Sequence, residues 1–306
     1  MLSILIDNNT LTGFKNYLGK KGVNYFYVSS FAQFIEALVL ADKIFVDKMS
    51  FNISEIADFI EFLNPKLKKI VFGLEISDKI RGNAVSYAQD IERKLNFEYK
   101  EEYDDMHLLR AYFYRYLSIK YDLPYFPHIK RTFFLSLLEG LKENIAEYRK
   151  AFRIYENLRY QAYSDLLKKE LINYEYKSLP YPQVFYYLVD KANNILELIE
   201  IAIDLRKSKN AIAYRKWCSE LYEANKNYNH LKQDKLFKEV EKYFLKICSY
   251  QKSKDDIRWQ ISFPFSITLT NIPFFKNKHH LLFLKQIIKS TNYKCIEEKL
   301  KGIFNI

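Results

Sequence analysis

The chain has 306 residues, enough for two ordinary domains or for one large domain with a sizeable core. Its hydrophobic content of 49% argues against a disordered chain, and the absence of any GxGxxG or GxxxxGK[ST] sequence excludes the common glycine-loop nucleotide-binding enzymes. The formal net charge of +11 is compatible with a polyanionic partner such as nucleic acid, although a lysine-rich surface that keeps the protein soluble explains the same excess.

The first third of the chain alternates between short apolar runs and helical patterns. Strands are predicted at Leu2–Asp7, Asn24–Val28, Lys43–Asp47, Lys69–Phe72 and Phe97–Lys100. Helices are predicted between them, at Leu11–Gly19, Ser30–Leu40, Ser54–Leu63 and Ser77–Leu95. This alternation predicts an α/β domain with a mostly parallel sheet over residues 1–103.

From residue 104 onward, long helical patterns replace the alternation, so residues 104–306 are predicted to form an all-α helical domain. Its helices are expected at Met106–Tyr121, Ile129–Asn173, Phe185–Lys207, Ala211–Asn225, Leu231–Tyr250 and His280–Ser290. A short extended segment near 258–272 is the exception, because apolar residues alternate there partly at period two around Pro264.

Acidic residues at predicted strand ends are the leading candidates for chemistry. An apolar run ends in Asp7 and then turns through Asn-Asn-Thr into a helix, which puts Asp7 where ligands and metals gather in open α/β sheets. Asp47 closes a second predicted strand, and Glu36 lies on an apolar helix face between these two strands. If the strands are parallel neighbours, Asp7 and Asp47 emerge at the same edge of the sheet.

Clustered carboxylates suit a hard divalent cation, so Mg²⁺ or Mn²⁺ is the expected cofactor. Such an ion activates water and stabilises the charge that builds on a phosphate during in-line displacement. Further acids are available to join this site: Asp42, Asp78, Asp104 and Asp105.

Each of these acids also has a structural explanation. Asp7 fits an Asx turn or a helix N-cap, Glu36 fits a helix residue paired with a lysine, and Asp47 fits a cap at a strand exit. A second nuclease pattern, the Glu-x-Lys of restriction-type enzymes, is present at Glu98 and Lys100. That tripeptide carries little weight in a chain so rich in Glu and Lys.

The opening sequence Ile-Leu-Ile-Asp-Asn-Asn-Thr-Leu resembles the first strand of PIN-like nucleases. The resemblance covers the first third of the chain and implies a PIN-like, Rossmannoid fold with a metal-dependent nuclease site. It implies that Asp7 binds the metal and that Glu36 is the second acidic ligand. It further implies that Asp78, with Asp104 or Asp105, completes the site; we take Asp105 as the third metal ligand.

Basic residues of the second part are candidates for holding substrate phosphates. Arg110 lies on an aromatic-rich helical segment, and Arg131 follows a proline-rich joint. Arg206 and Arg215 belong to a basic sequence around a predicted helix junction. Ordinary structural roles explain the same residues, since cations near helix C-termini offset the helix dipole and aromatic side chains fill cores.

The three cysteines are far apart and odd in number, which fits a reducing compartment. The opening residues lack the charged region of a signal peptide, and no apolar run is long enough to span a bilayer. We therefore expect a cytoplasmic protein without membrane contact.

The leading hypothesis is a metal-dependent nuclease that prefers RNA to DNA and acts as a toxin or an antiviral-defence effector. The segment from Leu205 to Trp217 also resembles uncharacterised bacterial proteins, some of them encoded near phage-defence genes. The alternative is a non-catalytic protein whose helical part binds a protein partner or nucleic acid. An exposed basic or aromatic groove would favour this alternative, whereas acids within reach of one metal would favour the nuclease.

Overall fold

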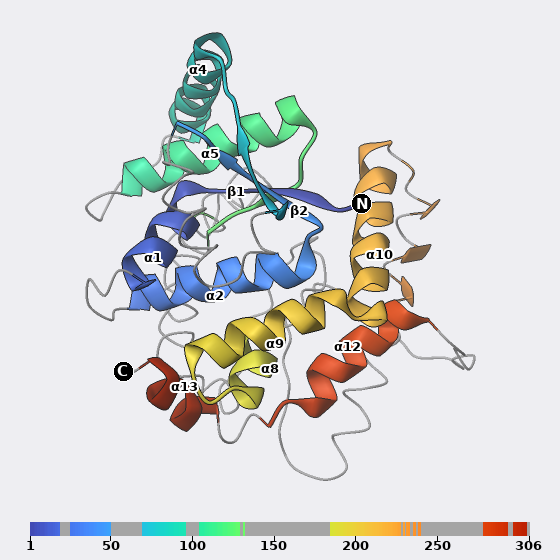
Figure 1. Ribbon diagram of the computed structural model, residues 1–306. Helices are drawn as coiled ribbons and strands as arrows, with labels where there is room; N and C mark the ends of the chain where they lie inside the picture. The colour runs from blue at the N-terminus through green and yellow to red at the C-terminus, as the bar shows by residue number, and fades with distance from the viewer. Residues whose placement is uncertain are drawn as a thin grey trace. The chain divides into compact units, whose positions relative to one another are not determined.

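The computed structural model describes residues 1–18, 25–49, 69–95, 104–128, 131, 184–227, 229, 231–232, 235–236, 238–239, 278–292 and 296–304 (Figure 1). The chain divides into two compact units. Unit 1 consists of Met1–Leu2, Leu38–Leu40 and Leu158–Ile306. Unit 2 consists of Ser3–Ala37 and Ala41–Asn157.

Unit 2 contains a parallel sheet whose four described strands have the order β3-β2-β1-β4. These strands are β1 (Ser3–Ile6), β2 (Lys43–Asp47), β3 (Val71–Leu74) and β4 (Tyr125–Phe126). The chain adds β2 and β3 on one side of β1 and then returns to add β4 on the other side. The strand order therefore reverses between β1 and β4, and such a switch point is where open α/β sheets bind ligands.

Helices lie on both sides of the strands in unit 2. They are α1 (Asn8–Leu18), α2 (Tyr25–Leu40, whose residues Leu38–Leu40 belong to unit 1), α4 (Asp78–Leu95) and α5 (Asp104–Tyr121). Figure 1 shows α4 and α5 on one side of β1 and β2, with α1 and α2 on the other. The structure therefore confirms the predicted parallel sheet and its flanking helices. Helices lie on both faces because the central strands carry apolar residues on both faces, and these residues are buried by packing against helices.

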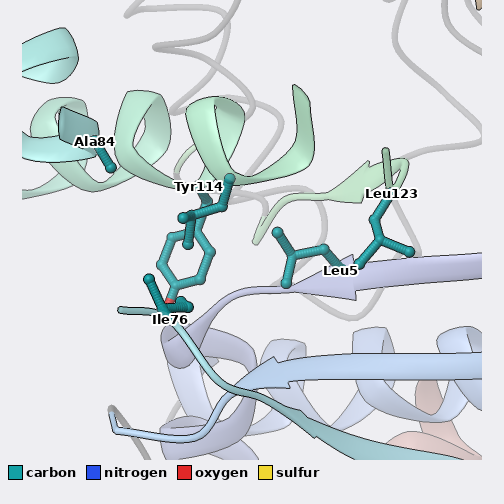
Figure 2. Close-up of a cluster of buried hydrophobic side chains, with 6 residues drawn as sticks. Leu5, Ile76, Ala84, Tyr114 and Leu123 are labelled. Carbon is teal, nitrogen blue, oxygen red and sulfur yellow. The ribbon is translucent and has the colours of Figure 1, made fainter. Parts of the chain in front are cut away.

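A buried apolar cluster joins the sheet to α4 and α5 (Figure 2). Its members are Leu5, Ile76, Ala84, Tyr114, Leu117 and Leu123. On the other side, the ring of Phe14 in α1 lies 5.7 Å from that of Phe31 and 4.3 Å from that of Phe34, both in α2. Burial of these side chains supplies the main force that holds the helices on the strands.

The predicted strand at Asn24–Val28 is wrong, because α2 already begins at Tyr25. Aromatic and β-branched residues favour strands only weakly, and here they continue directly into the apolar helix that follows. The strands that end at Asp7 and Asp47 were placed correctly to within a residue. The sheet also extends past residue 103, since β4 and the adjacent α5 belong to unit 2.

The described part of unit 1 is helical beyond the chain's first residues. It contains α8 (Val184–Lys191), α9 (Ile195–Lys207), α10 (Lys209–Lys226), α12 (His279–Ser290) and α13 (Ile296–Phe304). Asn194 caps α9 by accepting a hydrogen bond from the backbone N–H of Glu197 at 3.0 Å, and the Glu197 carboxylate accepts from the backbone N–H of Asn193 at 2.8 Å. These two hydrogen bonds fix where α9 begins.

Several predicted elements lie outside the described residues. They are the helix at Ser54–Leu63, the strand at Phe97–Lys100 with its Glu-x-Lys pattern, most of the helix at Ile129–Asn173, and the extended segment near 258–272. Within the described ranges, no helix is long and apolar enough to cross a membrane.

Candidate functional site

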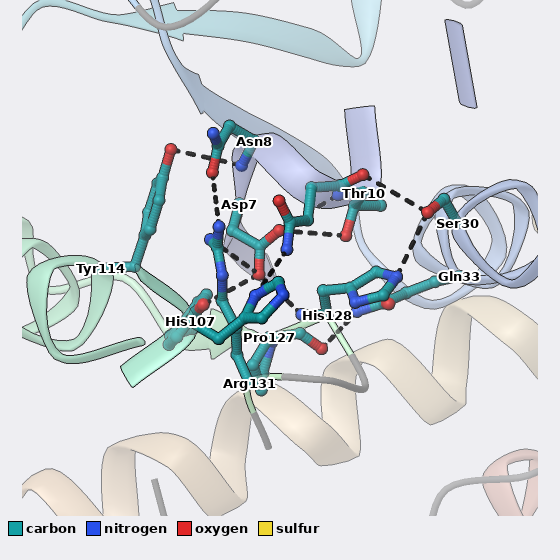
Figure 3. Close-up of polar contacts among 12 residues, drawn as sticks. Asp7, Asn8, Thr10, Ser30, Gln33, His107, Tyr114, Pro127, His128 and Arg131 are labelled. Atoms are coloured by element: carbon teal, nitrogen blue, oxygen red, sulfur yellow. Dashed lines mark hydrogen bonds and ion pairs between the residues drawn. The ribbon is translucent and has the colours of Figure 1, made fainter. Parts of the chain in front are cut away.

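Asp7 follows β1 directly, and its side chain is completely buried at the carboxyl edge of the sheet (Figure 3). Its Oδ1 accepts a hydrogen bond from the backbone N–H of Thr10 at 3.1 Å. Its Oδ2 accepts from the backbone N–H of His128 at 2.7 Å and from the hydroxyl of Tyr125 at 2.9 Å. The Nη1 atom of Arg131 lies 3.4 Å from the same Oδ2. Both carboxylate oxygens are therefore engaged by protein donors.

The surroundings of Asp7 determine its charge. Burial acts to raise the pKa of the Asp7 carboxyl, but Arg131, His128 and the backbone donors outweigh it and hold that pKa below its usual value. Burial acts to lower the pKa of Arg131, and the nearby carboxylate more than reverses this effect. Loss of water and the negative charge of Asp7 raise the pKa of the Tyr125 hydroxyl well above its ordinary value. The site therefore holds an ionised acid, an ionised base and a neutral phenol.

Arg131 is the buried counter-charge of Asp7. Its side chain has no exposed surface, and its Nη2 donates a hydrogen bond to Asn8 Oδ1 at 2.8 Å. Its guanidinium lies over the ring of Tyr114, 5.3 Å from the ring centre, and the Tyr114 hydroxyl accepts from the backbone N–H of Asn8 at 3.2 Å. The structure thus places Arg131 inside the fold, which corrects its prediction as a phosphate ligand on a binding surface.

A second set of polar contacts ties α2 to the segment after β4 (Figure 3). Ser30 Oγ lies 3.2 Å from His128 Nε2 and donates a hydrogen bond to the carbonyl oxygen of Asn9 at 3.3 Å. Gln33 donates to the carbonyl oxygen of Pro127. The Ser30 and His128 side chains have the spacing of a nucleophile and a base, but both are completely buried. We therefore interpret this pair as a packing contact of α2.

Asp47 repeats the arrangement of Asp7 one strand away. It ends β2, it is buried, and its Oδ1 accepts hydrogen bonds from Arg81 Nη2 at 2.9 Å and from the backbone N–H of Met49 at 3.1 Å. Arg81 belongs to α4, which follows the neighbouring strand β3. Each of these strand-end acids therefore pairs with an arginine that the chain supplies after an adjacent strand.

The other predicted acids do not join Asp7 in a described metal site. Glu36 is buried in α2, and Asp78 is exposed as the first residue of α4. Asp105 lies in the first turn of α5, and its side chain is outside the described part. Among the described side chains, no three His, Cys, Asp or Glu form a group that could hold a metal ion.

The remaining predicted arginines have different positions. In unit 1, Arg215 is buried, and its Nη1 donates to the carbonyl oxygens of Val39 and Arg206, each at 3.0 Å. Arg206 donates to the carbonyl oxygen of Leu38. These arginines therefore satisfy carbonyls in the last turns of helices, which corrects the phosphate-binding prediction for Arg215.

Arg110, in contrast, is exposed on α5 in unit 2. It lies one turn after His107, whose Nδ1 is 3.4 Å from Asn9 Nδ2. His107 and Asn9 are both half-buried, so polar side chains remain accessible beside the buried Asp7. We call Asn9, His107 and Arg110 the polar rim.

Comparison of the chain with protein-family models, curated proteins and solved structures found no match. The likeness to PIN-like nucleases therefore remains a resemblance carried by the opening strand.

Sequence reasoning found Asp7 and offered the capping role that its contact with Thr10 shows. It singled out Arg131 for another role, but it missed Tyr125 and His128. Tyr125 and His128 lie beside prolines in a short segment with no strand periodicity, so nothing local links them to Asp7. The only sequence signal was the proline-flanked Tyr-Phe pair after a helix, which indicated a joint between elements.

Proposed function

We propose that the protein binds nucleic acid through phosphate contacts at the carboxyl edge of the sheet in unit 2, and that Asp7 supports this edge without binding a catalytic metal. The pairing of the buried Asp7 carboxylate with Arg131 supports the structural role of Asp7, and the exposed Arg110 of the polar rim supports the phosphate contacts. Like the alternative drawn from the sequence, the proposal is non-catalytic, but it places the binding site in unit 2 and not in the helical part.

The electrostatics around Asp7 disfavour a divalent cation. A metal ligand needs free lone pairs, whereas the oxygens of Asp7 accept hydrogen bonds from Thr10, His128 and Tyr125. The guanidinium of Arg131 also cancels the carboxylate's charge, so a dication would meet a local charge near zero and a neighbouring cation.

The polar rim has the donors that a phosphate needs. Arg110 supplies a permanent positive charge, and the amide of Asn9 and the ring of His107 supply further hydrogen-bonding groups. Contacts of this kind position a nucleic acid without reading its sequence. The net charge of +11 also favours association with a polyanion such as nucleic acid.

A metal-dependent, PIN-like nuclease with Mg²⁺ or Mn²⁺ stays a prediction from the sequence. It is favoured by the position of Asp7 and Asp47, which end neighbouring parallel strands at one edge of the sheet. The same samples test both functions.

The test measures binding of labelled single-stranded RNA, and of DNA with the matching sequence, by fluorescence anisotropy at salt concentrations between about 50 and 200 mM. We expect Arg110→Ala to weaken binding by about three- to tenfold and to lower the salt slope by roughly one. Arg93→Ala is the matched control, because Arg93 is an exposed arginine of α4 in the same unit.

Two results would contradict the proposal. The first is binding that Arg110→Ala and Arg93→Ala change equally or not at all, since the polar rim would then carry no phosphate contact. The second is RNA cleavage that requires Mn²⁺, is prevented by EDTA and is lost in a folded Asp7→Asn variant. That outcome would establish the nuclease instead.

A further inference from the structure

We draw no further inference here: the strongest candidate, the side-chain cluster in unit 1 where His280 of α12 stacks on Trp217 of α10 and meets the carboxylate of Glu239, carries nothing, because most residues around Glu239 lie outside the part of the chain that the structure describes.

Discussion

The guanidinium of Arg131 lies 3.4 Å from the carboxylate of Asp7, and neither side chain is exposed to solvent. The pair joins the residue after β1 to the chain after β4. These two strands flank the point where the strand order reverses. A buried charge that loses its partner is strongly unfavourable, so each residue depends on the other. This relationship makes Asp7 a structural anchor of unit 2.

Acid should weaken the fold through Asp7. The pKa of the Asp7 carboxyl is lower in the folded protein than in the unfolded chain, so the unfolded chain takes up a proton at higher pH than the folded one. The stability that Asp7 contributes is therefore fully present above the unfolded-state pKa and is lost as pH falls through the folded-state pKa. We expect the unfolding free energy of the wild type to decline below about pH 4 more steeply than that of Asp7→Asn.

Denaturant titrations across this pH range check the expectation. Asp90→Asn should keep the slope of the wild type, because Asp90 forms an exposed pair with Arg93. Parallel pH profiles for the wild type and Asp7→Asn would show that Asp7 contributes nothing to the acid sensitivity.

Cys218 should be unreactive in the folded protein. Burial raises the pKa of its thiol to about 12, even though Tyr214 and Arg215 act in the opposite direction. Only the thiolate attacks thiol reagents, so a chain with Cys248→Ser and Cys295→Ser should react slowly at about pH 8 and rapidly once unfolded. The labelling rate is measured from the absorbance of the thiol that the reagent releases. Rapid labelling of Cys218 under native conditions would contradict this expectation.

Arg215 should contribute to the stability of unit 1. Its substitution by alanine leaves the carbonyls of Val39 and Arg206 without a charged donor, so we expect the unfolding free energy to fall by about 2 kcal/mol or more. Lys216→Ala, at the exposed neighbouring position, should change it by less than about 0.5 kcal/mol. If Arg215→Ala kept full stability but weakened RNA binding, Arg215 would be a phosphate ligand after all.

The sequence predicted the strands at Asp7 and Asp47 because both are short apolar runs that stop at a polar residue. It also predicted that both carboxylates leave the sheet at one edge, since parallel neighbouring strands end on the same side. Both predictions depend only on the order of apolar and polar residues within a few positions of the chain, and that order can be read directly from the sequence.

The role of Asp7 depends on contacts that local patterns do not record. β4 has two residues flanked by prolines, which is too short for any periodicity, and its place beside β1 is set by the folded core. Arg131 meets Asp7 only through that placement. An acid at a strand end is equally suited to a metal and to an arginine, and the tertiary fold decides between them.

The measurement that tests the structural role of Asp7 most directly is a double-mutant cycle with Asp7→Asn and Arg131→Gln, read as unfolding free energies in denaturant. We expect each single substitution to destabilise the protein by about 3–5 kcal/mol, and the double variant to lose at least about 1 kcal/mol less than the sum of the two. Acids preorganised for a metal commonly cost stability, so their removal stabilises the fold. An Asp7→Asn variant as stable as the wild type, or more stable, would contradict the account.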